Sequence, residues 1–98
     1  MPIGSFINAI PAPVFMAIHI AAGVIGAFFA RRAFAARAGD VAWGFVLYAL
    51  AELSYLTYHL DWTVFLFAHT VSEVLDLLAF IIIFAGLGRR VFAAAAAR

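Results

Sequence analysis

Three histidines and three carboxylic acids lie inside segments of this chain that are otherwise apolar. These residues are His19, Glu52, His59, His69, Glu73 and Asp76. A charged side chain near the centre of a bilayer costs about 2.5–3.5 kcal/mol on insertion scales, so such residues usually face protein and mark a function. The sequence therefore predicts a polar cluster at membrane depth.

Helical spacing arranges these residues in stripes. His69, Glu73 and Asp76 follow one another at i, i+4 and i+7, which places them on one face of a helix. A second segment carries a stripe of the same kind, made of Tyr48, Glu52, Tyr55 and His59. In a third segment Gly23 follows His19 by four residues, a small residue that allows a neighbouring helix to approach. Each segment is therefore expected to turn one polar or small face toward the others.

The first interpretation of the cluster is a metal site. At a rise of about 1.5 Å per residue, His19, Glu52 and His69 all fall about 9–12 Å below the outer boundary, with Glu73 about 5 Å deeper. Imidazole and carboxylate together suit zinc, iron or copper. The expected ligands are His19, Glu52, His69 and Glu73. Tyr55, His59 and Asp76 are expected to support these ligands or to relay protons.

Three other interpretations stay open. The same cluster could move protons or cations in a homo-oligomeric transporter, because His59, His69, Glu73 and Asp76 descend from the outer rim toward the midplane. A histidine could ligate haem or chlorophyll inside a helical bundle. The cluster could also be a hydrogen-bonded network that only holds the helices in register.

The composition excludes several classes of protein. Hydrophobic residues make up 68% of the 98 residues and charged residues 11%, whereas a soluble domain has about 25% charged residues. The net charge of +1 gives no basic field for nucleic acid. The chain has no cysteine, which excludes disulfides and thiolate sites, and it lacks phosphate-loop and nucleophile-elbow motifs. We therefore expect an integral membrane protein that is not an enzyme on its own.

The apolar runs predict an all-α fold with three transmembrane helices. A helix needs about 20 residues to cross a bilayer. The chain is expected to form one membrane domain with an interfacial segment at 1–12, spans at 13–38, 41–60 and 62–88, and a tail at 89–98. The short connection predicts that the second and third helices form a tight antiparallel hairpin, and Gly86 and Gly88 are expected to end the third helix.

The arginines predict how the helices are oriented. The chain contains six basic residues: Arg31, Arg32, Arg37, Arg89, Arg90 and Arg98. With three spans both groups fall on one side, so the positive-inside rule puts the N-terminus outside and the C-terminus in the cytoplasm of a prokaryotic-type cell. The 16% aromatic content suits broad docking faces. We expect a small subunit of a larger membrane complex, with lipids and other integral membrane subunits as partners.

Overall fold

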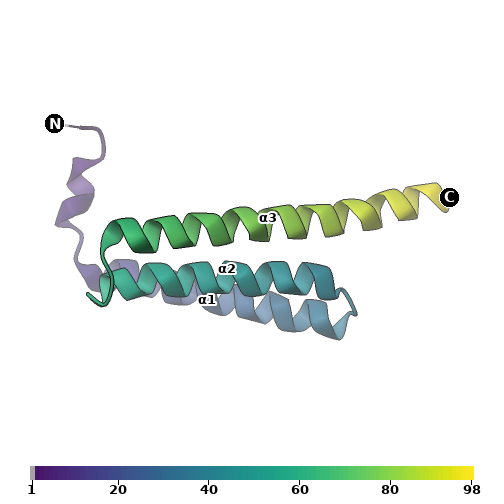
Figure 1. Ribbon diagram of the computed structural model, residues 1–98, viewed down its shortest axis with the longest axis horizontal. Coiled ribbons are helices and arrows are strands. Elements are labelled where there is room, and N and C mark those ends of the chain that lie inside the picture. Colours follow the sequence, from purple (N-terminus) through teal and green to yellow (C-terminus); the bar gives the residue numbers. More distant parts are fainter. Residues whose placement is uncertain (1) are drawn as a thin grey trace.

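The computed structural model describes residues 2–98, and these residues form helices and turns without any strand. The elements are the 3₁₀ helix η1 (Ser5–Ala9) and the α-helices α1 (Ala12–Ala35), α2 (Gly39–His59) and α3 (Phe65–Ala96) (Figure 1). The three α-helices are each long and apolar enough to cross a membrane. The expectation of an all-helical chain with three such helices is confirmed.

Proline and a left-handed residue set the boundaries of α1. The helix begins directly after Pro11, and Pro13 lies in its first turn, where its missing N–H costs no intrahelical hydrogen bond. At the far end the chain turns at Arg37, whose φ of 59° lies in the left-handed region. The next helix, α2, starts two residues later, so α1 and α2 are antiparallel neighbours.

The connection between α2 and α3 is longer than the sequence predicts. Residues 60–64 lie between the two helices, and α3 begins at Phe65, three residues after the expected start at Trp62. Asp61 has a φ of 61°, a conformation that aspartate tolerates better than most residues because its short side chain can bond locally. The hydroxyls of Thr57 and Thr63, 2.9 Å apart, tie the two sides of this turn together.

The third helix does not end at Gly86 and Gly88, as the sequence predicts, but continues to Ala96. Alanine is the strongest helix former, and the alanine-rich end of the chain outweighs the two glycines. At 1.5 Å per residue a helix of 32 residues is about 48 Å long, which exceeds the hydrocarbon thickness of about 30 Å. Figure 1 shows the C-terminal end of α3 reaching past the ends of α1 and α2.

The central helix is α2, which packs against both α1 and α3. Among residues 2–98, α1 and α3 share no close backbone contact. The three-helix arrangement is thus open between α1 and α3. Side chains on the part of α2 that lies between them can reach either neighbour.

Small residues let α2 and α3 approach closely. The buried residues of these two helices include Ala42, Gly44, Ala51, Ala68, Ser72, Ala79 and Gly86. Ser72 Oγ donates a hydrogen bond to the carbonyl of Ala51 across the interface, at 2.9 Å. A Cβ atom on Gly86 would lie 2.7 Å from Asp40 Oδ2, so this crossing requires glycine. Close backbone packing of this kind is typical of helix pairs in membranes.

The exterior is strongly apolar. Exposed large side chains occur on all three α-helices and include Ile25, Phe28, Leu53, Phe67, Leu77 and Phe84. A soluble monomer rarely exposes contiguous apolar surface on this scale, whereas hydrocarbon chains solvate such side chains without cost. The distribution of side chains therefore agrees with the composition in assigning the bilayer as the solvent.

Candidate functional site: a polar network between the helices

A hydrogen bond between His19 and Glu52 joins α1 to α2. The Nδ1 atom of His19 lies 2.6 Å from Oε2 of Glu52, and the two side chains are only 18% and 12% exposed. Gly23, one turn further along α1, lies next to Glu52, since a Cβ atom there would make an ordinary van der Waals contact of 3.7 Å with the Cβ of Glu52. The pair satisfies two polar groups that would be costly to bury alone.

Tyr55 links this pair to the third helix. Its hydroxyl donates a hydrogen bond of 2.8 Å to Oε1 of Glu73 on α3. Its ring stacks on the ring of His19, with centroids 5.0 Å apart. Tyr55 therefore contacts a histidine of α1 and a carboxylate of α3 at the same time, although α1 and α3 do not meet.

His59 connects the network to the end of the molecule that holds η1. Its ring stacks on His19, with centroids 5.2 Å apart, and on Phe15 at 5.4 Å. Beside it is a hollow of about 370 Å³, lined by Asn8 of η1 together with Tyr58, His59 and other residues. This hollow therefore lies beside the imidazole of His59, at the end of the molecule that holds η1.

Within residues 2–98, neither His69 nor Asp76 forms a hydrogen bond with the His19–Glu52 pair. The ring of His69 stacks on Phe65 of its own helix, with centroids 5.2 Å apart. Asp76 is partly buried, and its Oδ1 atom is a buried acceptor without a hydrogen-bond partner within residues 2–98. A buried polar atom without a partner is rare in native structures and is typically explained by a functional role or by water.

Glu73 is exposed on the outer surface of α3. Its neighbours on this surface include Val74 and Leu77, which are 52% and 60% exposed. At this depth a charged side chain facing lipid would cost about 2.5–3.5 kcal/mol, which one hydrogen bond from Tyr55 offsets only in part. Glu73 thus differs from Glu52, which faces its partner inside the protein.

The structure brings together only part of the expected metal ligands. Among residues 2–98, no group of three or more His, Asp or Glu side chains lies close enough to hold one metal ion. His19 and Glu52 are paired, whereas Glu73 contacts Tyr55 and His69 contacts Phe65. The binding of zinc, iron or copper, and the ligation of haem, stay predictions.

A second polar cluster, which the sequence stripes do not indicate, lies at the opposite end of α2. Arg89 and Arg90 of α3 both donate hydrogen bonds to Asp40, the latter at 2.7 Å to Oδ1. Asp40 precedes the predicted span, and bonds from Arg90 and from the backbone of Val41 hold the pKa of its carboxyl well below its usual range. The antiparallel packing predicted for the second and third helices implies this contact, because it places the start of α2 beside the C-terminal part of α3.

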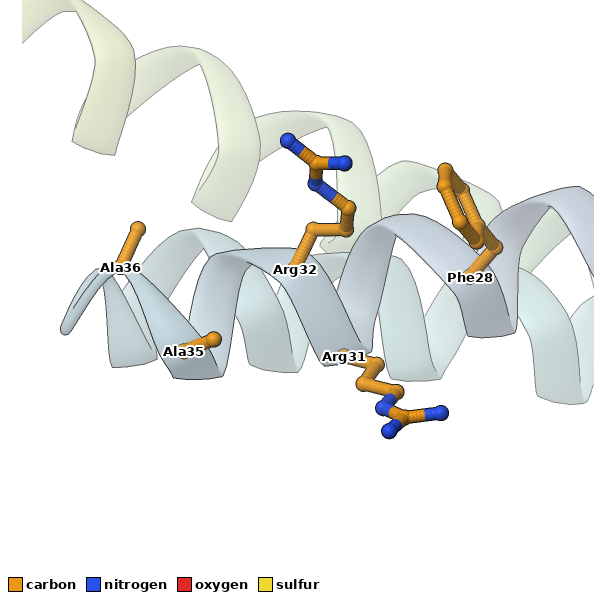
Figure 2. A pocket seen from close by; sticks show the side chains of 5 residues that line it. All are labelled: Phe28, Arg31, Arg32, Ala35 and Ala36. Carbon is orange, nitrogen blue, oxygen red and sulfur yellow. The ribbon is translucent and has the colours of Figure 1, made fainter.

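A hollow of about 500 Å³ on α1 lies away from the polar network. It is lined by Phe28, Arg31, Arg32, Ala35 and Ala36. Figure 2 shows that Arg31 and Arg32 point in different directions from the helix, and Arg32 lies over the ring of Phe28, 5.8 Å from its centroid. Because its polar groups diverge, this hollow does not define a site.

The polar network reaches only the half of the molecule that lies next to η1 and the turn at residues 60–64. No ionisable side chain occurs in residues 20–30, 41–47 or 77–88, which form the other half of the three helices. The network therefore ends near Asp76, and a wide apolar layer separates it from the Asp40 cluster.

No protein-family model, no curated protein and no solved structure matches this chain. The helices and the composition define its class as a multi-pass helical membrane protein.

Proposed function

We propose that this protein is a small multi-pass subunit that exchanges protons between the outer side and the middle of a cell membrane, inside a larger membrane assembly. The observation that carries the proposal is the bridging position of Tyr55. This residue links the His19–Glu52 pair, through a ring stack and a hydrogen bond, to Glu73.

The chemistry of the linked groups suits proton exchange. Imidazole gains and loses a proton near neutral pH, and buried carboxyls in transmembrane helices are common members of proton relays. His59 lies between the outer hollow and His19, so a proton arriving from outside meets an imidazole first. The steps from His59 to His19 and from His19 to Tyr55 are ring contacts, which side-chain rotation or water would convert into proton paths.

The same arrangement favours a subunit over an independent transporter. Residues 20–30, 41–47 and 77–88 include no titratable side chain, so these stretches offer no path onward for a proton at Glu73 or Asp76. Glu73 faces outward and could pass the proton to a neighbouring subunit. The arginines at the ends of α1 and α3 support an orientation with the N-terminus outside in a prokaryotic-type membrane.

The experiment uses the full chain in lipid nanodiscs and infrared difference spectra recorded between two pH values. Wild type should show a carboxyl carbonyl band that grows as the pH falls, together with imidazole bands. Glu52→Gln should remove part of the carboxyl band and change the imidazole bands, because His19 loses its ionisable partner. Asp61→Asn, in the exposed turn, is the matched control and should leave the imidazole bands unchanged. Spectra of Glu52→Gln identical to wild type in both regions would refute the network.

A metal ion held by His19 and Glu52 is the second candidate function. It is favoured by the short distance between an imidazole nitrogen and a carboxylate oxygen, with the ring of His59 next to them. These side chains would supply the ligand types that zinc or iron prefers, and an assembly partner would complete the shell. Elemental analysis of the native assembly should then find one metal per chain, lost in His19→Ala and retained in His69→Ala. Equal metal content in all three samples would exclude this pair as the site.

A further inference from the structure

Glu73 is a carboxylate placed on an apolar surface deep in a predicted span. It follows Phe65, the first residue of α3, by eight positions, which is about 12 Å along the helix. Val74 and Leu77 beside it are exposed and apolar. An acidic side chain is unfavourable on a lipid-facing surface of this kind. We therefore expect a polar group of another molecule to contact Glu73.

The acids on this stripe have acceptor capacity that the chain does not fill. Tyr55 donates to Oε1 of Glu73, and within residues 2–98 no other hydrogen bond reaches this carboxylate. Asp76, on the same stripe and about one turn deeper, has a buried oxygen atom without a partner. The missing group is therefore a hydrogen-bond donor, and the strongest donor to a carboxylate is a cation.

The chain itself supplies no cation at this depth. None of its six arginines lies in the outer half of a helix. Arg89 is sixteen residues beyond Glu73 on the same helix, which is about 24 Å away. His69 is the nearest histidine along α3, and its ring is already stacked on Phe65.

A second copy of the chain fits this surface poorly. Most homodimers are two-fold symmetric, and the same patch then meets itself. In a membrane with both copies in one orientation, Glu73 would face Glu73 of its copy at the same depth. Two acids in apolar surroundings disfavour one another's ionised form, and the contact would add no donor other than a shared proton.

We infer that the face of α3 around Glu73 binds a transmembrane helix of another subunit, and that this helix carries a lysine or arginine at the depth of Glu73. The inference rests on the proposed role as a subunit and names the chemistry of the partner. A cation there fills the free acceptor of Glu73, and its field extends to Asp76. The long apolar stretches of α3 on either side of the acid pack against the rest of the partner helix.

The test measures helix association in liposomes by energy transfer from a dye on the full chain. The probes are synthetic leucine-rich transmembrane helices with a single lysine at the depth of Glu73, with leucine in its place, or with the lysine moved two turns toward the cytoplasmic end. The matched lysine helix should bind at least tenfold more tightly than the other two. Glu73→Gln, whose amide oxygen can still accept from Tyr55, should abolish that preference.

Phe67→Leu, an exposed apolar change on another side of α3, is the control and should keep the tenfold preference. Equal binding of the lysine and leucine helices would overturn the inference, as would a preference that survives Glu73→Gln. Strong association between copies of this chain that Glu73→Gln abolishes would overturn it in favour of a homodimer.

The two proposals fail separately. Binding of the lysine helix, with no infrared change in Glu52→Gln, would support the docking surface and refute the proton network. The expected infrared changes in Glu52→Gln, with no preference for the lysine helix, would refute the docking surface alone.

Discussion

At the scale of single residues, the informative contrast is between Glu52 and Glu73. Both are acids within transmembrane segments, and each accepts or shares one hydrogen bond. Glu52 is turned toward His19, while Glu73 is exposed. Glu52 is satisfied by its own chain and Glu73 only in part. We therefore propose that Glu52 exchanges protons inside the chain, and that Glu73 is the end of the network that contacts a partner.

The strength of the His19–Glu52 pair can be measured by a double-mutant cycle. We expect His19→Phe and Glu52→Leu each to lower the free energy of unfolding in detergent, with a coupling of about 0.6–1.7 kcal/mol, the range found for interhelical hydrogen bonds in membranes. The cycle is read from unfolding by sodium dodecyl sulfate in mixed micelles. The pair Tyr58→Phe and Glu52→Leu, which shares no hydrogen bond, should show coupling near zero. A His19–Glu52 coupling equally near zero would contradict the contact.

The sequence predicts the level of each site residue along its helix better than the direction in which its side chain points. Counting residues from the outer ends puts His19, Glu52 and His69 at one level, and the structure pairs the first two. His69 lies elsewhere because a stripe shows which residues share a face, while the packing of small residues such as Ala68 and Ser72 decides how that face is rotated. That rotation depends on contacts between helices, which the sequence of one helix does not contain.

At the scale of helices, small residues decide which pairs form. The α2–α3 interface is built from alanine, glycine and serine, so the two backbones approach closely. The end of this interface opposite the turn at residues 60–64 is closed by Asp40 with two arginines of α3. The sequence predicts three apolar helices, but not the extension of α3 past Gly88, since local glycine signals compete there with the alanine-rich end.

Gly86 and Gly88 form a matched pair for testing this interface. A Cβ atom at Gly86 would lie 2.7 Å from Asp40 Oδ2, whereas one at Gly88 would meet nothing within 4 Å. Gly86→Ala should therefore destabilise the protein by about 1–3 kcal/mol through overpacking. Gly88→Ala should be neutral, or stabilising by up to about 1 kcal/mol through helix propensity. Thermal or detergent unfolding of both variants measures the difference, and equal effects would contradict the close approach.

At the scale of the whole molecule, the charged ends and the apolar middle indicate how the chain lies in a bilayer. The ends of α1 and α3 that carry arginine are at the same end of the structure, since Asp40 follows α1 directly and contacts α3. The other end holds η1, the outer hollow and the turn at residues 60–64. This asymmetry is the physical basis for placing the N-terminus outside.

The orientation can be read directly because the chain has no cysteine. Single variants Ser5→Cys and Ala97→Cys give one label site near each end. In intact cells a membrane-impermeant maleimide should label Ser5→Cys, and should reach Ala97→Cys only after permeabilisation. Labelling of Ala97→Cys alone in intact cells would reverse the topology and place the His59 hollow in the cytoplasm.

Within residues 2–98, α1 and α3 each make close backbone contacts with α2 and none with each other, so the helix pairs that pack together are consecutive in the chain. The α1–α2 pair, with the His19–Glu52 bond, can form as soon as the ribosome has delivered two helices to the insertion machinery. The third helix then docks onto a finished hairpin. Before α3 is inserted, Tyr55 cannot form its hydrogen bond with Glu73. The order of synthesis therefore lets the His19–Glu52 contact form before the Tyr55–Glu73 contact.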